Sequence, residues 1–201
     1  MQPFEIIMSI AEVYLALEGE TPPAINAAPG GNWVLLGTAG SRNQASAGVK
    51  FIGTSAYVKH STAGATGFVK AVRTAEDVSV EVTIEDLTPE LFAKKMNLAG
   101  VREVAAASGV AGYKSFGGRM GSDVQTWSLL LRIPASPSGD GLNSQCYISK
   151  CIEEGQLEIV FDGEGTAAGL AFKFSVLEDP NAASDSERFF IWTTQTAAAL
   201  P

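Results

Sequence analysis

Residues 69–97, VKAVRTAEDVSVEVTIEDLTPELFAKKMN, are the most informative part of the chain for its fold. From Asp77 to Glu85 polar and apolar side chains alternate, and the apolar positions are Val78, Val80, Val82 and Ile84. A period of two with β-branched residues on the apolar side predicts a strand that has one buried and one solvent-exposed face. The pattern changes after this strand, which indicates a different element.

Residues 86–97 predict one short α-helix. Thr88 is a suitable N-cap, Pro89 fits the first helical position, and Glu90 is favoured near the positive end of the helix dipole. Leu87, Leu91 and Phe92 then form one apolar stripe. Lys94 and Lys95 lie in the final turn, where cations are favoured. With Asn97 as a stop signal, we expect the helix to span about 89–97.

Other alternating or apolar runs predict further strands, separated by turns. These strands are expected at 11–18, 33–36, 49–60, 68–74, 101–106, 125–133, 145–152, 156–161, 170–177 and 188–194. Residues 108–123 are expected to form a glycine-rich loop in which Tyr113, Phe116 and Arg119 are exposed or contact a partner. Together these patterns predict a mainly β (α+β) protein, an antiparallel β-sandwich or barrel with one flanking α-helix.

The composition agrees with one globular domain over residues 1–201. The chain is 46% hydrophobic and contains 21 glycines and 9 prolines, which suits many short strands joined by turns. No apolar run approaches the roughly 18 residues of a membrane-spanning helix. Residues 1–15 contain no base and carry Glu5, so we expect no secretory signal and synthesis in the cytoplasm. Residues 195–201 are expected to form a loose tail.

The net charge of −8 is unevenly distributed. Residues 1–20 contain four acids and no base, whereas residues 21–75 contain no acid but five bases, Arg42, Lys50, Lys59, Lys70 and Arg73. This clustering is either chance on solvated faces or a basic region that docks on an acidic surface of a neighbouring copy. The candidate self-assembly contacts are these five bases together with Glu81, Glu85 and Glu90.

The sequence lacks the motifs of common enzymes and cofactor sites. It contains no G-x-S-x-G, H-E-x-x-H or Walker motif, and its single histidine, His60, lies at the end of an expected strand. The glycine-rich run 163–169 precedes a strand, so it predicts a turn and not a phosphate loop. Glu153 and Glu154 lack the spacing of an EF-hand. We therefore expect no enzyme activity, no cofactor and no metal site.

Cysteine spacing and net charge bear on two further properties, the state of the thiols and nucleic-acid binding. Cys146 and Cys151 lie five residues apart on one expected strand, which predicts opposite faces and two reduced, packed thiols. A pI near 4.7 argues against a protein that holds nucleic acid, because such proteins neutralise phosphates with Lys and Arg. An acidic pI is equally ordinary for any soluble protein.

Three patterns within residues 62–97 carry a family resemblance. They are Thr-Ala-Gly from Thr62, Val-Lys-Ala-Val-Arg-Thr from Val69, and a strand followed by Asp-Leu-Thr-Pro-Glu from Asp86 and a helix that ends near Asn97. This stretch resembles the major tail proteins (tail tube proteins) of long-tailed bacteriophages. The rest of the chain agrees with that family mainly in element order and length.

The resemblance implies a fold of the tail tube type and a self-assembling virion protein. It implies a mobile β-hairpin loop over about 37–74 that contacts the next ring, and stacked, hexameric rings whose inner sheets line the channel. The implied partners are further copies of the chain and the tape measure, tail terminator and tail tip proteins. Double-stranded DNA would pass through without specific binding. The protein would lie in the virion tail, after assembly in the host cytoplasm.

Two other functions stay open from the sequence. One is a monomeric β-sandwich binding or decoration module that binds its ligand through residues 108–123. The other is a tube subunit of a related contractile injection or type VI secretion system. An enzyme of unfamiliar type would need a concave site with perturbed acids, to which the sequence gives no pointer.

Overall fold

A computed structural model gives the fold and describes residues 11–37, 44–64, 66–97, 100–118, 121, 123–139, 141–159 and 169–199. Its strands are β1 (Glu12–Leu17), β2 (Val34–Leu35), β3 (Gln44–His60), β4 (Lys70–Ile84), β5 (Arg102–Val104), β6 (Tyr113–Ser115), β7 (Thr126–Ile133), β8 (Ser144–Glu153), β9 (Leu170–Val176) and β10 (Ile191–Thr194). Its helices are α1 (Pro89–Lys95) and the 3₁₀ helix η2 (Asp185–Glu187).

Eight strands form one antiparallel sheet in the order β2-β1-β7-β8-β9-β4-β3, and β10 pairs with β8 beside this path. One edge of β8 has two partners, because β10 pairs with residues 144–147 and β9 pairs with residues 151–153. The sheet divides between these two parts of β8. Apolar side chains from β1, β4, β7, β8 and β9 meet in one core cluster, which also contains Leu91 of α1. The expected mainly β fold, an antiparallel sandwich with one flanking helix, is confirmed.

Helix α1 is fixed to the sheet by a buried ion pair. Lys95 Nζ lies 2.5 Å from Glu153 Oε1 of β8, and the two side chains are only 1% and 6% exposed. The same Nζ lies 5.5 Å from the ring centroid of Phe172 in β9. A buried charge is tolerated only when it is paired and hydrogen-bonded, so this pair fixes where the helix sits on the sheet.

The Glu153 carboxylate also explains why one expected strand is missing. Its Oε1 accepts hydrogen bonds from the backbone N–H groups of Gly155, at 2.9 Å, and Lys173, at 3.2 Å. Because this side chain takes the backbone donor of Lys173, the following segment does not extend the sheet. The prediction of a strand at 156–161 is therefore wrong for residues 156–159, and residues 160–161 lie outside the described part of the chain.

Helix α1 begins as expected and ends earlier. Thr88 Oγ1 accepts a hydrogen bond from the N–H of Leu91 at 3.4 Å, and Pro89 occupies the first turn. The helix stops at Lys95 instead of 97, because Met96 is the C-cap and Asn97 adopts a left-handed φ of 53°. Asparagine tolerates this conformation better than most residues, so it can end a helix as glycine does.

The cysteines are free and buried, as expected, but they do not lie on opposite faces. Both belong to the same core cluster. The register between β7 and β8 shifts, since Trp127 pairs with Cys151 while Leu129 pairs with Ile148. Two residues of β8 therefore oppose one of β7, and this bulge turns the strand by one position. The prediction of opposite faces failed because a bulge leaves no clear mark in the sequence.

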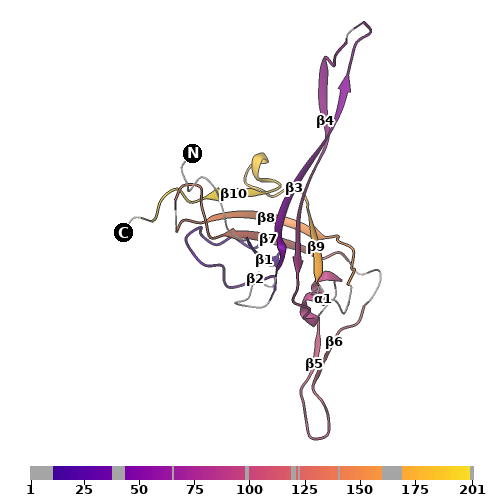
Figure 1. Ribbon diagram of the computed structural model, residues 1–201, viewed down its shortest axis with the longest axis vertical. Helices are drawn as coiled ribbons and strands as arrows, with labels where there is room; N and C mark the ends of the chain where they lie inside the picture. Colours follow the sequence, from indigo (N-terminus) through magenta and orange to yellow (C-terminus); the bar gives the residue numbers. More distant parts are fainter. Residues whose placement is uncertain are drawn as a thin grey trace.

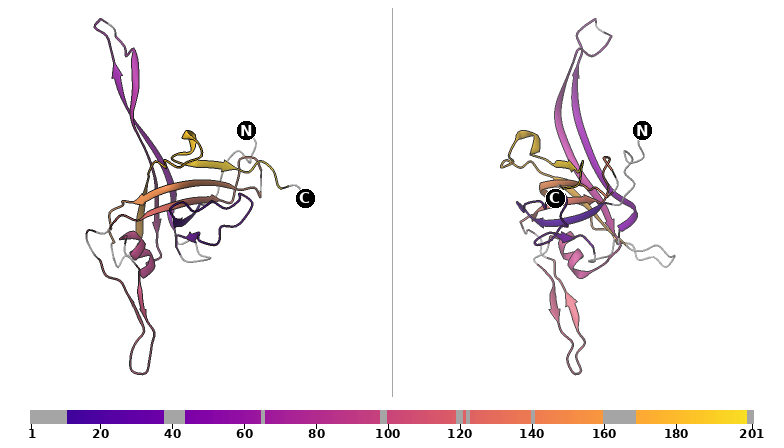
Figure 2. Two further views of the ribbon diagram at one scale, coloured as in Figure 1. Left: turned by 180° about the vertical axis from the view of Figure 1, so that it is seen from behind. Right: turned by 90° about the vertical axis from the view of Figure 1, so that its left-hand side faces the viewer.

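Two hairpins leave the body in opposite directions along the longest axis of the molecule (Figure 1). We call residues 53–77 of the β3–β4 hairpin the upper arm and residues 102–115, which contain β5 and β6, the lower arm. The same opposition is visible from behind and from the side (Figure 2). The molecule therefore has a body with one projection at each end.

The long hairpin differs from the expected one in detail. Strand β3 begins at Gln44, inside the segment expected to be mobile, and β4 runs without a break from Lys70 to Ile84. Register shifts between Gln44 and Val49 and between Ala56 and Tyr57 allow the two strands to stay paired. Residues 38–43 lie outside the described part, and the mobility expected over 37–74 stays a prediction.

Candidate self-association surfaces

The upper arm is exposed along its whole described length. Every described residue from 53 to 77 is exposed. Five large apolar side chains are among them, with 50% to 68% of their surface exposed: Tyr57, Val58, Phe68, Val69 and Val72. Exposed apolar surface of this kind is typical of interaction sites, and a two-stranded hairpin has little stability without a covered face.

Local contacts shape the upper arm without burying it. Arg73 forms an ion pair with Glu76, and its guanidinium lies 5.5 Å from the ring centroid of Tyr57. Lys59 Nζ lies 5.5 Å from the ring centroid of Phe68 across the hairpin. Hydrogen bonds from Ser55 and Arg73 lower the pKa of the Tyr57 phenol. The arm thus carries basic and aromatic groups together on exposed strands.

Strand β3 is an edge strand of the described sheet. Its 17 residues pair with β4 alone, so the N–H and C=O groups on its other side face no strand within the described chain. Long uncovered edges invite pairing with another chain, and monomeric proteins usually shorten, twist or cover them. This edge is therefore a second candidate surface for contact between copies.

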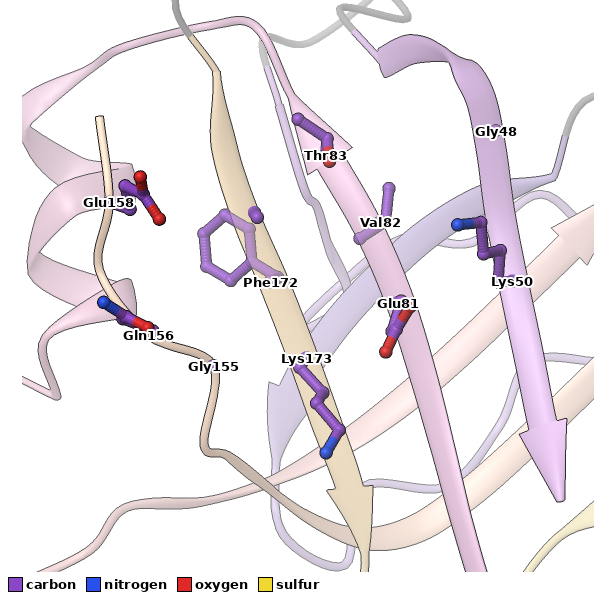
Figure 3. A pocket seen from close by; sticks show the side chains of 11 residues that line it. Gly48, Lys50, Glu81, Val82, Thr83, Gly155, Gln156, Glu158, Phe172 and Lys173 are labelled. Carbon is purple, nitrogen blue, oxygen red and sulfur yellow. The ribbon is translucent and has the colours of Figure 1, made fainter. Parts of the chain in front are cut away.

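A groove of about 350 Å³ lies over β3, β4 and β9, and Figure 3 shows its lining. Lys50, Glu81 and Lys173 lie side by side on the three strands, since Glu81 is in register with both lysines. Lys173 Nζ lies 2.8 Å from Glu154 Oε1, and the pKa of Lys173 is raised by its hydrogen bond to that carboxylate. Charges of both signs alternate here, so the groove is not a site for a highly charged ligand.

A second groove, of about 300 Å³, lies where the upper arm leaves the body. We call it the arm-root groove. Phe51 and Val78 from the hairpin and Phe189 and Phe190 before β10 give it an aromatic and aliphatic lining. The rings of Phe51 and Phe190 meet edge to face, with centroids 5.1 Å apart. Glu76 and Asp77 complete its acidic rim.

The sequence predicted the first strand of the lower arm, at 101–106, but expected a loop over 108–123 where β6 lies. The lower arm forms its own two-stranded sheet, with Arg102 opposite Ser115 and Val104 opposite Tyr113. The Ser-Gly pair at 108–109, where Gly109 has a φ of 74°, is the signal that could have predicted a hairpin.

Contacts with helix α1 hold the base of the lower arm. Lys114 Nζ lies 2.6 Å from Glu90 Oε1 and 3.8 Å from Glu103 Oε2. The ring of Phe116, just beyond β6, stacks on Phe92 with centroids 5.7 Å apart. The base is thus fixed, whereas residues 105–112 at the tip are exposed and carry no charge.

The residues that the sequence singled out do not form one site within a single chain. Lys50 and Glu81 meet in the groove over β3, β4 and β9. Lys59, Lys70 and Arg73 lie on the upper arm, and Arg42 lies outside the described residues. Glu85 follows the other end of β4, and Glu90 pairs with Lys114. Apart from Lys50 and Glu81, the described basic and acidic candidates thus lie in different parts of the molecule.

The described residues contain no cluster of three or more His, Cys, Asp or Glu side chains suited to a metal ion. Glu153, considered above for calcium, is instead the partner of Lys95. Within the described part of the chain, none of the helices combines the length and apolar character needed to cross a bilayer. No protein-family model and no curated protein sequence matches this chain.

Proposed function

We propose that the protein is a structural virion protein that assembles into the tail tube of a long-tailed bacteriophage. In this proposal the chain forms stacked, hexameric rings that enclose the path of the genome into the host. The proposal rests on the resemblance of residues 62–97 and on the two projections of the body. A net charge of −8 favours a tube through which DNA slides, because phosphate would bind to a basic wall.

The upper arm is the observation that supports assembly most strongly. Its large apolar side chains stay at least half exposed in the described chain, and two of them, Val58 and Val72, lie directly opposite each other on the paired strands. Burial of apolar surface contributes about 25 cal/mol per Å². Contact with another copy would therefore gain free energy that the isolated chain does not have.

The free edge of β3 supports lateral association in the same way. A neighbour's strand could accept and donate the backbone hydrogen bonds that β3 leaves open on one side. Edge pairing around a closed ring would cover the edge of every copy, and contacts between the ends of the body would join rings. Two kinds of contact are thus available for a tube.

Electron microscopy of two proteins tests this proposal. One is the parent chain, and the other has residues 57–74 replaced by Asn-Gly, a dipeptide that favours a tight hairpin turn between the paired residues Ala56 and Ala75. We expect hollow rings or tubes from the parent at high concentration. The shortened chain should keep the thermal midpoint of the parent, because the described residues within the deleted stretch are all exposed, yet form no tubes.

A matched control changes exposed residues outside both arms. Val124→Ser affects a side chain that is 62% exposed and should leave both folding and tubes unchanged. Isolated particles from the parent at every concentration, with or without other tail components, would contradict the proposed function. Normal tubes from the shortened chain would show that the upper arm has no part in assembly.

A further inference from the structure

We propose that the lower arm is a second docking element, whose tip binds in the arm-root groove of another copy. This inference rests on the proposed function, since it requires that copies associate head to tail. The groove lies at the root of the upper arm. The lower arm leaves the body on the other side and points away from that root (Figure 1), so one chain cannot join its own tip and groove. Two copies aligned along the long axis can.

The chemistry of the two surfaces matches. The tip, residues 105–112, has the sequence AAASGVAG, so it is slender, uncharged and mostly apolar. Val110 is 53% exposed at this tip. The groove offers the rings of Phe51, Phe189 and Phe190. Small side chains lose little conformational entropy on binding, and an uncharged tip avoids the desolvation of an ion.

The lengths of the two arms fit side-by-side packing in opposite directions. At about 3.3 Å per residue, a fully extended chain would reach at most about 36 Å from residue 53 to residue 64 of the upper arm, and at most about 23 Å from residue 102 to residue 109 of the lower arm. When the lower tip reaches the neighbour's arm-root groove, the neighbour's upper tip therefore extends about 13 Å beyond the base of the lower arm. It would then lie against the end of the body that carries α1.

Charge complementarity supports this arrangement. Lys59 and Lys70 of the upper arm would come beside the base of the lower arm. The exposed charged groups around that base are Glu85, Glu90, Glu103, Arg102 and Lys114. Lys114 is already paired with Glu90, whereas residues 53–75 of the upper arm contain no acid. Opposite charges on two such surfaces fix register and orientation more than they add affinity.

Engineered disulfides test the contact directly. The pair Thr54→Cys and Val110→Cys places one thiol at the groove and one at the lower tip. A disulfide needs Cα atoms within about 7 Å, so these two positions can bridge only between copies. Burial raises the pKa of each native thiol, Cys146 and Cys151, to about 12, which keeps both unreactive in the folded protein.

We expect mild oxidation of this double variant to give a ladder of covalent oligomers, because each copy has one tip and one groove. The matched control, Thr62→Cys with Val110→Cys, moves the first thiol to the far end of the upper arm and should give no ladder. Association without a 54–110 ladder, or equal ladders from both pairs, would overturn the docking and leave the proposed function standing. A parent chain that never associates would remove both.

A charge at the tip gives a second readout. Val110→Asp sets a carboxylate against the acidic rim formed by Glu76 and Asp77, and like charges brought together repel each other. We expect the concentration needed for association to rise roughly tenfold or more. The same change at exposed Val124 should have no such effect. Equal behaviour of the two variants would count against the docking.

Discussion

Strand β4 runs through two very different environments. Its last residues, 78–84, lie in the body and include the buried side chains Val80, Val82 and Ile84. Its first residues, 70–77, lie in the upper arm and are exposed on both faces. The secondary structure is the same in both parts, but only the body part gains free energy from burial within its own chain.

This contrast separates what folds the protein from what we propose assembles it. Changes in the body are expected to alter the free energy of unfolding, and changes in the arm are expected to alter association only. The first two of the following experiments pair a change in the body with a related change in an exposed region.

The largest loss of stability is expected from replacing an aromatic residue of the core. Phe174 is 1% exposed and stacks on Phe172 with ring centroids 5.7 Å apart. Phe174→Ala should reduce the free energy of unfolding by about 3–5 kcal/mol, as measured by urea denaturation. Phe68→Ala on the upper arm should change it by less than about 0.5 kcal/mol. Similar losses from both variants would mean that the arm contributes to the fold of the single chain.

The second-largest loss of stability is expected from breaking the buried ion pair between Lys95 and Glu153. Lys95→Met leaves the Glu153 carboxylate buried without its cation, which should cost about 3 kcal/mol in the free energy of unfolding. Adding Glu153→Gln should restore part of the loss. Lys114→Met breaks an exposed pair with Glu90 and should leave the denaturation midpoint almost unchanged. A small effect of Lys95→Met would show that the pair does not fix α1.

A smaller effect is expected from raising the pH. Burial raises the pKa of Cys146 and Cys151 from 9.0 to about 12. Above pH 9 the unfolded thiols ionise while the folded ones stay protonated, so stability is full below pH 9 and is lost as the pH rises towards 12. Each thiol should cost about 1 kcal/mol between pH 9 and pH 10.

The matched control removes both thiols. In Cys146→Ala with Cys151→Ala, the free energy of unfolding should start lower but fall less steeply over the same pH range. An unchanged slope would mean that other groups, such as Tyr or Lys side chains, cause the pH dependence.

The smallest effect on stability is expected from Val58, which is 60% exposed on the upper arm. Val58→Asp should change the free energy of unfolding by less than about 0.5 kcal/mol. In our proposal it should weaken association strongly, because the new carboxylate replaces an apolar contact between copies. Sedimentation at increasing concentration measures this. Unchanged association would exclude this face of the upper arm from the contact.

The sequence predicted those parts of the fold whose signals are local. Alternation from Asp77 to Glu85 located the body part of β4, and Thr88 with Pro89 located the start of α1. The predictions that failed concern features set by residues far away in the sequence. The bulge in β8 that brings Cys146 and Cys151 into one core is set by the pairing of β8 with β7.

The candidate surfaces were predicted only in part. The basic character of the upper arm could be read from its composition, but its complete exposure could not, because exposure depends on what lies beside a segment. The buried pair of Lys95 with Glu153 joins residues far apart in the sequence. Of the lower arm, the strand expected at 101–106 contains β5, but β6 was missed because its three residues are too few to show a period.

The opposed directions of the two arms have one more consequence (Figure 2). A filament built by repeating a single head-to-tail step is directional, and its two termini display different faces of the subunit. One terminus would offer free upper arms and open arm-root grooves, and the other would offer free lower arms. Nothing in such a step limits growth, so a filament of fixed length would need two unlike capping proteins, one for each terminus.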